Sequence, residues 1–312
     1  MTKQVTNHIM MIRPVAFHMN EQTAVNNYYQ QKDEGSSEDQ TQAEAESQFD
    51  GFVEKLRAEG VTVTVFQDTK DPATPDSIFP NNWISFHEDG IIRLYPMYAE
   101  NRRVERREDI INSLKDSFEV ADVLSFTNWE SKSAYLEGTG SLLLDRQNKI
   151  AYAAISERTM PEVLEDFCEK TGYTKVAFKA NQTVKGERLP IYHTNVMMCL
   201  GEQFGLVCLD SIDDESERQN LIDSLEKTGK EIIDISESQK EEFAGNMLQV
   251  VGKDEQRLVV MSSAAFHSLS EDQIQRLEAH GKILHSDIHT IEKLGGGSAR
   301  CMMAEVFLPT KN

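Results

Sequence analysis

Three residues that could act together in nucleophilic chemistry, Cys301, His193 and Glu137, lie far apart in the sequence. Cys301 follows residues 295–298, Gly-Gly-Gly-Ser, whose missing side chains allow the backbone to approach a ligand closely. A thiolate attacks an electrophilic carbon once a neighbouring base has taken the thiol proton. Free cysteines are also common as small buried residues, and residues 302–307 have the apolar character of a buried terminal strand. The loop alone leaves both interpretations of Cys301 open.

Candidate partners for the thiol occur at the starts of two other apolar segments. His193, in "PIYHTNVMM", follows a proline-marked loop and is the first residue of an expected strand. That position would hold an imidazole rigidly while its ring faces a pocket, as a general base requires; a hydrogen-bonded loop histidine is the alternative. Glu137, in "YLEGTGSLLL", lies among glycines at the entrance of another expected strand, where a plain turn is the alternative.

The cysteines do not indicate a disulfide framework or a zinc site. None of the four forms a C-x-x-C pair or has zinc-finger spacing to histidine; they are Cys168, Cys199, Cys208 and Cys301. We therefore expect no metal site, and each cysteine is either buried or chemically active.

Composition excludes several classes of partner. The 312 residues contain 39% hydrophobic and 27% charged residues, a globular mixture, and the formal net charge is −20. This charge would repel nucleic acid and anionic membrane surfaces at long range. No signal peptide pattern and no apolar run long enough to span a bilayer is present, so the cytoplasm is the expected compartment.

The order of elements repeats along the chain. Alternating apolar residues and turn residues predict four hairpins, each followed by a helix. The hairpins cover residues 83–97, 141–155, 193–209 and 246–262, and the helices cover 101–118, 159–172, 214–229 and 270–281. An earlier helix reaches Gly60 and a strand covers 61–68, while residues near 31–47 suit either a solvated helix or a mobile loop. Because no linker divides these units, we expect a single domain over residues 1–312, with the polar loops gathered at one end of a ring.

Several motifs, taken in order, resemble the guanidine-modifying superfamily of arginine deiminases, dimethylarginine dimethylaminohydrolases and amidinotransferases. They are Asp76-x-x-Phe79-x-x-Asn82, Arg102-Arg103, Glu137-Gly138, Ser156-x-Arg158-Thr159, His193-x-Asn195 and Cys301. The segments "IRPVAFHMNEQTAVNN", "FPNNWISFH", "LYPMYAENRRVERR", "YHTNVMM" and "FAGNML" are similar to its citrulline utilisation hydrolase branch. The resemblance spans nearly the whole chain.

This resemblance implies an α/β fold, a five-bladed α/β propeller with pseudo-fivefold symmetry and the active site at its centre. It also implies that Cys301 is the nucleophile, that His193 transfers protons and that Glu137 orients the imidazole. No metal or organic cofactor is implied. The expected partner is a small-molecule substrate, and association into homo-oligomers stays open.

The substrate-binding positions differ informatively from relatives that bind a cationic guanidinium. Asn82 and Asn195 stand where such relatives often have aspartate. Two carboxylates suit a guanidinium, whereas two amides suit a neutral ureido group that carries a carbonyl acceptor. By the same resemblance, Asp76 would bind an α-ammonium, and Arg103 with Arg158 would bind an α-carboxylate. Arg102 would be either a ligand or a solvated charge.

The favoured function is hydrolysis of the ureido group of L-citrulline to L-ornithine, ammonia and carbon dioxide through a covalent Cys301 intermediate. The alternative is an arginine deiminase or dimethylarginine dimethylaminohydrolase-like guanidine hydrolase. Amidinotransfer is a further option. A non-catalytic amino-acid-binding protein is another, but binding alone would need no nucleophile.

Overall fold

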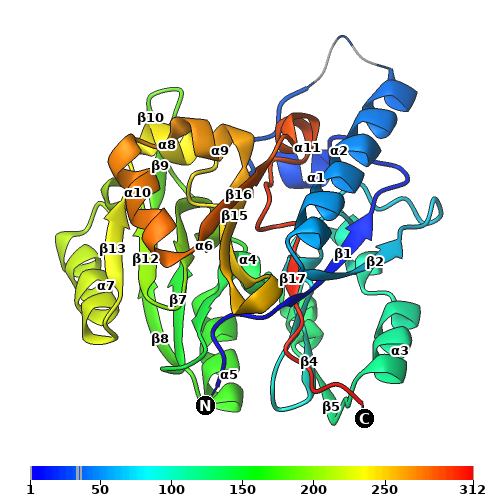
Figure 1. The fold of residues 1–312 in the computed structure, drawn as a ribbon, viewed down its shortest axis with the longest axis horizontal. Helices are drawn as coiled ribbons and strands as arrows, with labels where there is room; N and C mark the ends of the chain where they lie inside the picture. The colour runs from blue at the N-terminus through cyan, green and yellow to red at the C-terminus, as the bar shows by residue number, and fades with distance from the viewer. Residues whose placement is uncertain (1, 33–34, 36, 312) are drawn as a thin grey trace.

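The computed structural model of the chain describes residues 2–32, 35 and 37–311 (Figure 1). Within these residues there are five three-stranded sheets, each with an antiparallel and a parallel pair of strands. In four of them an antiparallel hairpin is followed by a helix and a third strand parallel to the second. In the first such sheet along the chain the elements are β3 (Ile84–Phe86), β4 (Ile91–Leu94), α3 (Glu108–Ser117) and β5 (Asp122–Ser125).

Three further sheets repeat this plan and confirm the remaining predicted hairpins and helices. One consists of β6 (Leu143–Asp145), β7 (Ile150–Ala154), α5 (Pro161–Thr171) and β8 (Thr174–Phe178). The next consists of β11 (Met198–Leu200), β12 (Phe204–Val207), α7 (Glu215–Lys227) and β13 (Glu231–Asp234). The last consists of β14 (Leu248–Val251), β15 (Arg257–Ser262), α10 (Glu271–His280) and β16 (Lys282–Ser286).

The fifth sheet joins the two ends of the chain. β1 (His8–Arg13) pairs parallel to β2 (Thr62–Gln67) and antiparallel to β17 (Ala304–Glu305). The helix between β1 and β2 is α2 (Glu38–Ala58), which begins with a capping box between Ser37 and Gln40 and buries an apolar stripe that includes Phe49 and Phe52. The stretch near 31–47 is thus helical from Glu38, while residues 33, 34 and 36 lie outside the described part of the chain.

A two-stranded hairpin, β9 (Asn181–Val184) with β10 (Glu187–Pro190), is added before β11. The short helices α8 (Glu237–Glu241) and α9 (Ser263–Ser268) lie near it at the top of Figure 1, together with α11 (His289–Gly295) and α1 (Glu21–Ala24) to the right. No helix in the described ranges is both long and apolar enough to cross a bilayer.

Single helical turns precede the first strands of three hairpins. They are η1 (Pro80–Asn82) before β3, α4 (Gly138–Ser141) before β6 and α6 (Thr194–Met197) before β11. β3 begins at Ile84, next to the predicted start at residue 83, whereas β6 and β11 begin two and five residues later than predicted. In Figure 1, α4 and α6 lie near the middle of the molecule, whereas α3, α7 and α10 lie at its periphery. In these inner turns, Asn82 and Asn195 lie within η1 and α6, and Glu137 and His193 are the N-cap residues of α4 and α6.

Two predicted strands begin later than the sequence indicated. The strand expected to begin at His193 begins at Met198, because local backbone bonds, such as Val196 N–H to the His193 carbonyl (3.2 Å), wind the chain into α6 first. The terminal strand expected over 302–307 is confined to Ala304–Glu305, since Cys301 lies in a turn whose N–H donates to the Ser298 carbonyl (2.9 Å).

We expect removal of residues 304–312 to destabilise the protein by about 5 to 9 kcal/mol. This truncation deletes β17 and three buried side chains, Val306, Phe307 and Leu308, each of which contributes about 1.5 to 3 kcal/mol when buried. Urea unfolding followed by circular dichroism measures the loss. Removal of residues 310–312 alone is the matched control and should change the free energy of unfolding by less than about 1 kcal/mol; equal effects of both truncations would contradict this role of β17.

Candidate active site

A small cavity brings together residues from distant parts of the chain. Every residue that lines it is buried. The lining residues are Thr23, Asn27, Asp76, Phe79, Asn82, Arg102, Arg158, Tyr192, His193, Gly295, Gly296, Gly297 and Cys301. The structure therefore places most of the sequence-predicted site residues in one cavity.

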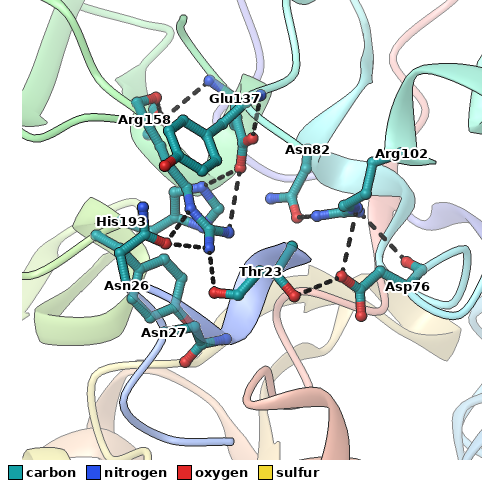
Figure 2. Close-up of polar contacts among 12 residues, drawn as sticks. Thr23, Asn26, Asn27, Asp76, Asn82, Arg102, Glu137, Arg158 and His193 are labelled. Atoms are coloured by element: carbon teal, nitrogen blue, oxygen red, sulfur yellow. Dashed lines mark hydrogen bonds and ion pairs between the residues drawn. The ribbon is translucent and has the colours of Figure 1, made fainter. Parts of the chain in front are cut away.

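Glu137 is a fully buried carboxylate behind His193 (Figure 2). Its Oε2 lies 2.7 Å from His193 Nε2 and 3.6 Å from Arg158 Nη1, and its Oε1 accepts a hydrogen bond from the Tyr98 N–H (2.9 Å). Burial alone would raise the pKa of Glu137, but the charge of Arg158 and the hydrogen bond from His193 outweigh it and lower the pKa to about 2. The carboxylate is charged at neutral pH.

His193 is held in a neutral form by the same surroundings. Burial lowers the pKa of His193 to about 4, because it outweighs the opposing effect of Glu137. A charged carboxylate only accepts hydrogen bonds, so Nε2 carries the proton and Nδ1 is the free acceptor. Nδ1 lies beside Gly140, where a Cβ atom would be 2.8 Å from it and 2.4 Å from Asn82 Nδ2. Only a residue without a side chain therefore fits at position 140. Because both atoms lie next to the same point, His193 Nδ1 and Asn82 Nδ2 are also close to each other.

The sulfur of Cys301 accepts two amide hydrogen bonds. Asn195 Nδ2 and Asn246 Nδ2 each lie 3.3 Å from Sγ. Asn195 was among the predicted site residues, although its contact is with the sulfur and it does not line the cavity itself. Asn246 was missed; the only sequence signal was one asparagine in "FAGNML", between a turn and an apolar strand.

Asn82 is oriented by Arg102, whose Nη1 donates to Asn82 Oδ1 (2.9 Å). This bond leaves Asn82 Nδ2 buried and without a partner. The guanidinium of Arg102 also forms a two-pronged contact with the Glu105 carboxylate at 2.9 Å for each bond. Arg102 is thus a buried part of the site and not a solvated charge.

The structure does not bring Arg103 to the cavity. Its Nε donates to the Met97 carbonyl (3.1 Å), and its guanidinium lies near Glu100 and Glu130 with about a quarter of the side chain exposed. Arg102 and Arg103 are consecutive residues of the 3-10 helix η2 (Glu100–Glu105). With three residues per turn, adjacent side chains project about 120° apart, so only one of the two can face the cavity.

Asp76 lies at the other side of the cavity, next to Arg102 (Figure 2). Its Oδ2 accepts hydrogen bonds from Asn20 Nδ2 (2.8 Å) and Thr23 Oγ1 (3.1 Å), whereas its Oδ1 is buried and has no partner. A buried acceptor of this kind suits an ammonium donor from a ligand.

Arg158 is enclosed by aromatic rings and by the segment that contains α1. Its guanidinium carbon lies 4.9 Å from the ring centre of Tyr192, and its Nη2 donates to the Thr23 carbonyl (2.8 Å). Its Nε donates to Asn26 Oδ1 (2.9 Å). Thr23, Asn26 and Asn27 belong to the segment "IRPVAFHMNEQTAVNN", which carries part of the family resemblance, but the sequence assigned no site role to these three residues. Among the described residues, no group of three or more His, Cys, Asp or Glu side chains is arranged to hold a metal ion.

Comparisons with known proteins identify the class to which this fold and site belong. The family model for eukaryotic N,N-dimethylarginine dimethylhydrolase matches residues 13–308. The chain therefore belongs to this family of hydrolases acting on carbon–nitrogen bonds, within the guanidine-modifying superfamily. No curated protein matches the chain.

Solved structures share the fold at low sequence identity. The N-terminal domain of ArgZ, an arginine dihydrolase from cyanobacteria, was solved as a cysteine-to-serine variant bound to substrate; it is 18% identical, with a TM-score of 0.74 over 97% of this chain and 98% of that one. A dimethylarginine dimethylaminohydrolase adduct with S-methyl-L-thiocitrulline is 16% identical, with a TM-score of 0.65 over 98% and 100% of the two chains. The apo structure of ArgZ is 18% identical to this chain, with a TM-score of 0.73. The match covers 97% of this chain but only 41% of that longer chain.

We expect His193 to make the protein more stable as the pH rises from about 4.5 to 6.5. In this range the unfolded chain protonates the histidine while the folded protein, in which the pKa is about 4, does not, so stability is lost as the pH falls. Replacement of His193 by Asn should reduce this rise by up to about 3 kcal/mol, measured by urea unfolding at several pH values. The exposed residue His18, replaced in the same way, is the control; an unchanged slope in His193→Asn would contradict the neutral buried state.

Proposed function

We propose that the protein is a cysteine-dependent hydrolase of the ureido group of L-citrulline and yields L-ornithine, ammonia and carbon dioxide. The observation that carries this proposal is a pair of unpartnered buried amide atoms, Asn82 Nδ2 and Asn195 Oδ1. One is a donor and the other is an acceptor. Asn82 lines the same cavity as Cys301, and the amide of Asn195 contacts its sulfur. A ureido group offers the complementary carbonyl oxygen and N–H groups, so that both amide atoms gain partners.

Charge supports the same substrate class. Asn195, whose amide touches the sulfur of Cys301, is neutral, and so is Asn82 beside His193. The carboxylate nearest His193, Glu137, is already shared with Arg158. A neutral ureido group therefore enters this end of the cavity without an unpaired charge, whereas a guanidinium finds no free carboxylate there.

The remaining groups fit the amino acid part of the substrate. Asp76 Oδ1 would accept from the α-ammonium, and Arg158 would bind the α-carboxylate in place of its present partners Asn26 and Thr23. Arg102 keeps Asn82 in its orientation, and so contributes to substrate binding indirectly.

The chemistry follows from the neutral state of His193. Nδ1 takes the thiol proton of Cys301, and the sulfur attacks the ureido carbon while electrons move to the oxygen, which Asn82 Nδ2 stabilises. The bond from this carbon to the side-chain nitrogen then breaks, and His193 returns the proton to that nitrogen, so that ornithine leaves. His193 next takes a proton from water, and the hydroxide attacks the carbamoyl carbon and displaces the sulfur, which regains its proton from His193. The released carbamic acid breaks down to ammonia and carbon dioxide.

Hydrolysis of arginine or a methylated arginine is the second candidate. It is favoured by the structural similarity to an arginine dihydrolase that was solved with its substrate and by the unpartnered carboxylate oxygen of Asp76 in the same cavity.

We also infer that residues 1–312 form one domain whose five sheets are the blades of an α/β propeller, an inference supported by their shared strand order. We keep the cytoplasm as the proposed compartment.

Incubation of the purified protein with citrulline or arginine, followed by analysis of the products, tests the proposal. We expect ornithine and ammonia from citrulline without any added amine acceptor. Cys301→Ala should remove turnover and retain citrulline binding, measured by calorimetry, because the sulfur supplies the bond-forming step and not the main binding contacts. Rapid conversion of arginine without any ornithine from citrulline would replace the proposal by the second candidate.

Replacement of Asn82 by Asp should shift the preference of the enzyme away from citrulline. The change swaps the unpartnered donor for a carboxylate that meets the ureido oxygen, and an unmade buried hydrogen bond costs about 1 to 3 kcal/mol. We therefore expect kcat/KM for citrulline to fall by about 10- to 100-fold and to fall less for arginine. Asn101→Asp, which adds the same charge close to the site but outside the cavity, is the control. Equal losses for both substrates would argue against substrate recognition by Asn82.

A further inference from the structure

Asn246 holds three groups of the candidate site with one amide. Its Nδ2 lies 3.3 Å from Cys301 Sγ and 2.8 Å from the Asn195 carbonyl, and its Oδ1 accepts from the Arg300 N–H (2.9 Å). Arg300 directly precedes Cys301. Because a peptide N–H only donates, the amide oxygen must face Arg300 and the two amide hydrogens must face the sulfur and the carbonyl. The orientation of Asn246 is thus fixed by its own contacts.

The backbone beside Asn246 is shaped for this contact. A Cβ atom on Gly245 would lie 2.4 Å from the Val196 carbonyl, so only glycine allows this turn to pack against α6. Phe243, three residues before Asn246, has a φ of 62°, which is uncommon for a bulky residue. The close packing at Gly245 and the unfavourable backbone conformation at Phe243 thus both occur in the turn that places the Asn246 amide next to the sulfur.

The two amides that donate to Cys301 differ in what else they contact. Asn195 keeps an unpartnered Oδ1, which the proposed function uses for substrate. Asn246, in contrast, has protein partners for both its amide nitrogen and its amide oxygen. It is also buried, with 1% of its surface exposed. Asn246 is therefore suited to the sulfur and to the loop that carries it, and not to the substrate.

We propose that Asn246 is a further catalytic residue, which stabilises the Cys301 thiolate by donating a hydrogen bond to Sγ and fixes the position of the sulfur through Arg300 N–H. Hydrogen bonds to an anion are stronger than those to the neutral group, so a donor at this place favours the thiolate over the thiol. This inference rests on the proposed role of Cys301 as nucleophile, but it does not depend on which substrate is attacked.

The test measures thiolate formation separately from turnover. The rate at which iodoacetamide modifies Cys301 is followed by peptide mass spectrometry from pH 5 to 10, which distinguishes Cys301 from the other cysteines. Asn246→Asp keeps the acceptor for Arg300 N–H and replaces the donor to sulfur by a carboxylate. We expect the midpoint of the pH dependence to move up by about 1 to 2 pH units and kcat for citrulline to fall by about 10- to 100-fold, with KM changed by less than about threefold.

Gln249→Glu is the matched control. Gln249 is similarly buried on β14, and its amide contacts the Glu202 N–H and the His280 carbonyl, away from the sulfur. The control should keep the wild-type pH dependence of modification. If Asn246→Asp does not fold, Asn246→Ser replaces it, with the same upward shift expected.

An unchanged pH dependence in a folded Asn246 variant, or an equal shift in Gln249→Glu, would overturn the inference. Absence of citrulline turnover in the wild type together with the expected shift would reject the proposed substrate and leave the role of Asn246 intact.

Discussion

The buried negative charge of Glu137 is the constraint on which the candidate site depends. A carboxylate without exposed surface is tolerable only when cations and donors surround it. His193, Arg158 and the Tyr98 N–H meet this need, and they come from separate parts of the chain. The same contacts fix the imidazole with Nδ1 free and hold Arg158 between aromatic rings. One charge thus determines the tautomer of the proposed base and the position of a proposed substrate ligand.

The inner turns make this convergence sterically feasible. Gly140 allows Asn82 and His193 to approach each other, and Gly245 allows the turn that carries Asn246 to lie against α6. Each of these turns is followed by the first strand of a three-stranded sheet, so the hydrogen-bonded sheets fix their positions. The candidate catalytic side chains lie on short segments at the inner ends of rigid elements, which is a general arrangement for catalytic groups.

Sequence patterns predicted the hairpins and helices because these depend on local periodicity and turn residues, as at residues 88–90 between β3 and β4. They failed at the inner turns, since a helix of four residues such as α4 is too short to show a period. They also could not tell Arg102 from Arg103, because the choice depends on the phase of a 3-10 helix. Asn246 was missed because its partners, Asn195 and Cys301, are more than fifty residues away in sequence.

The central claim is that the sulfur of Cys301 attacks the ureido carbon of citrulline. Rapid quenching of the enzyme with citrulline labelled by ¹³C at that carbon, followed by peptide mass spectrometry, tests this claim most directly. We expect a labelled carbamoyl group on the peptide that contains Cys301, formed and lost at rates consistent with turnover. Turnover of citrulline without label on Cys301, or with label on another residue, would contradict it.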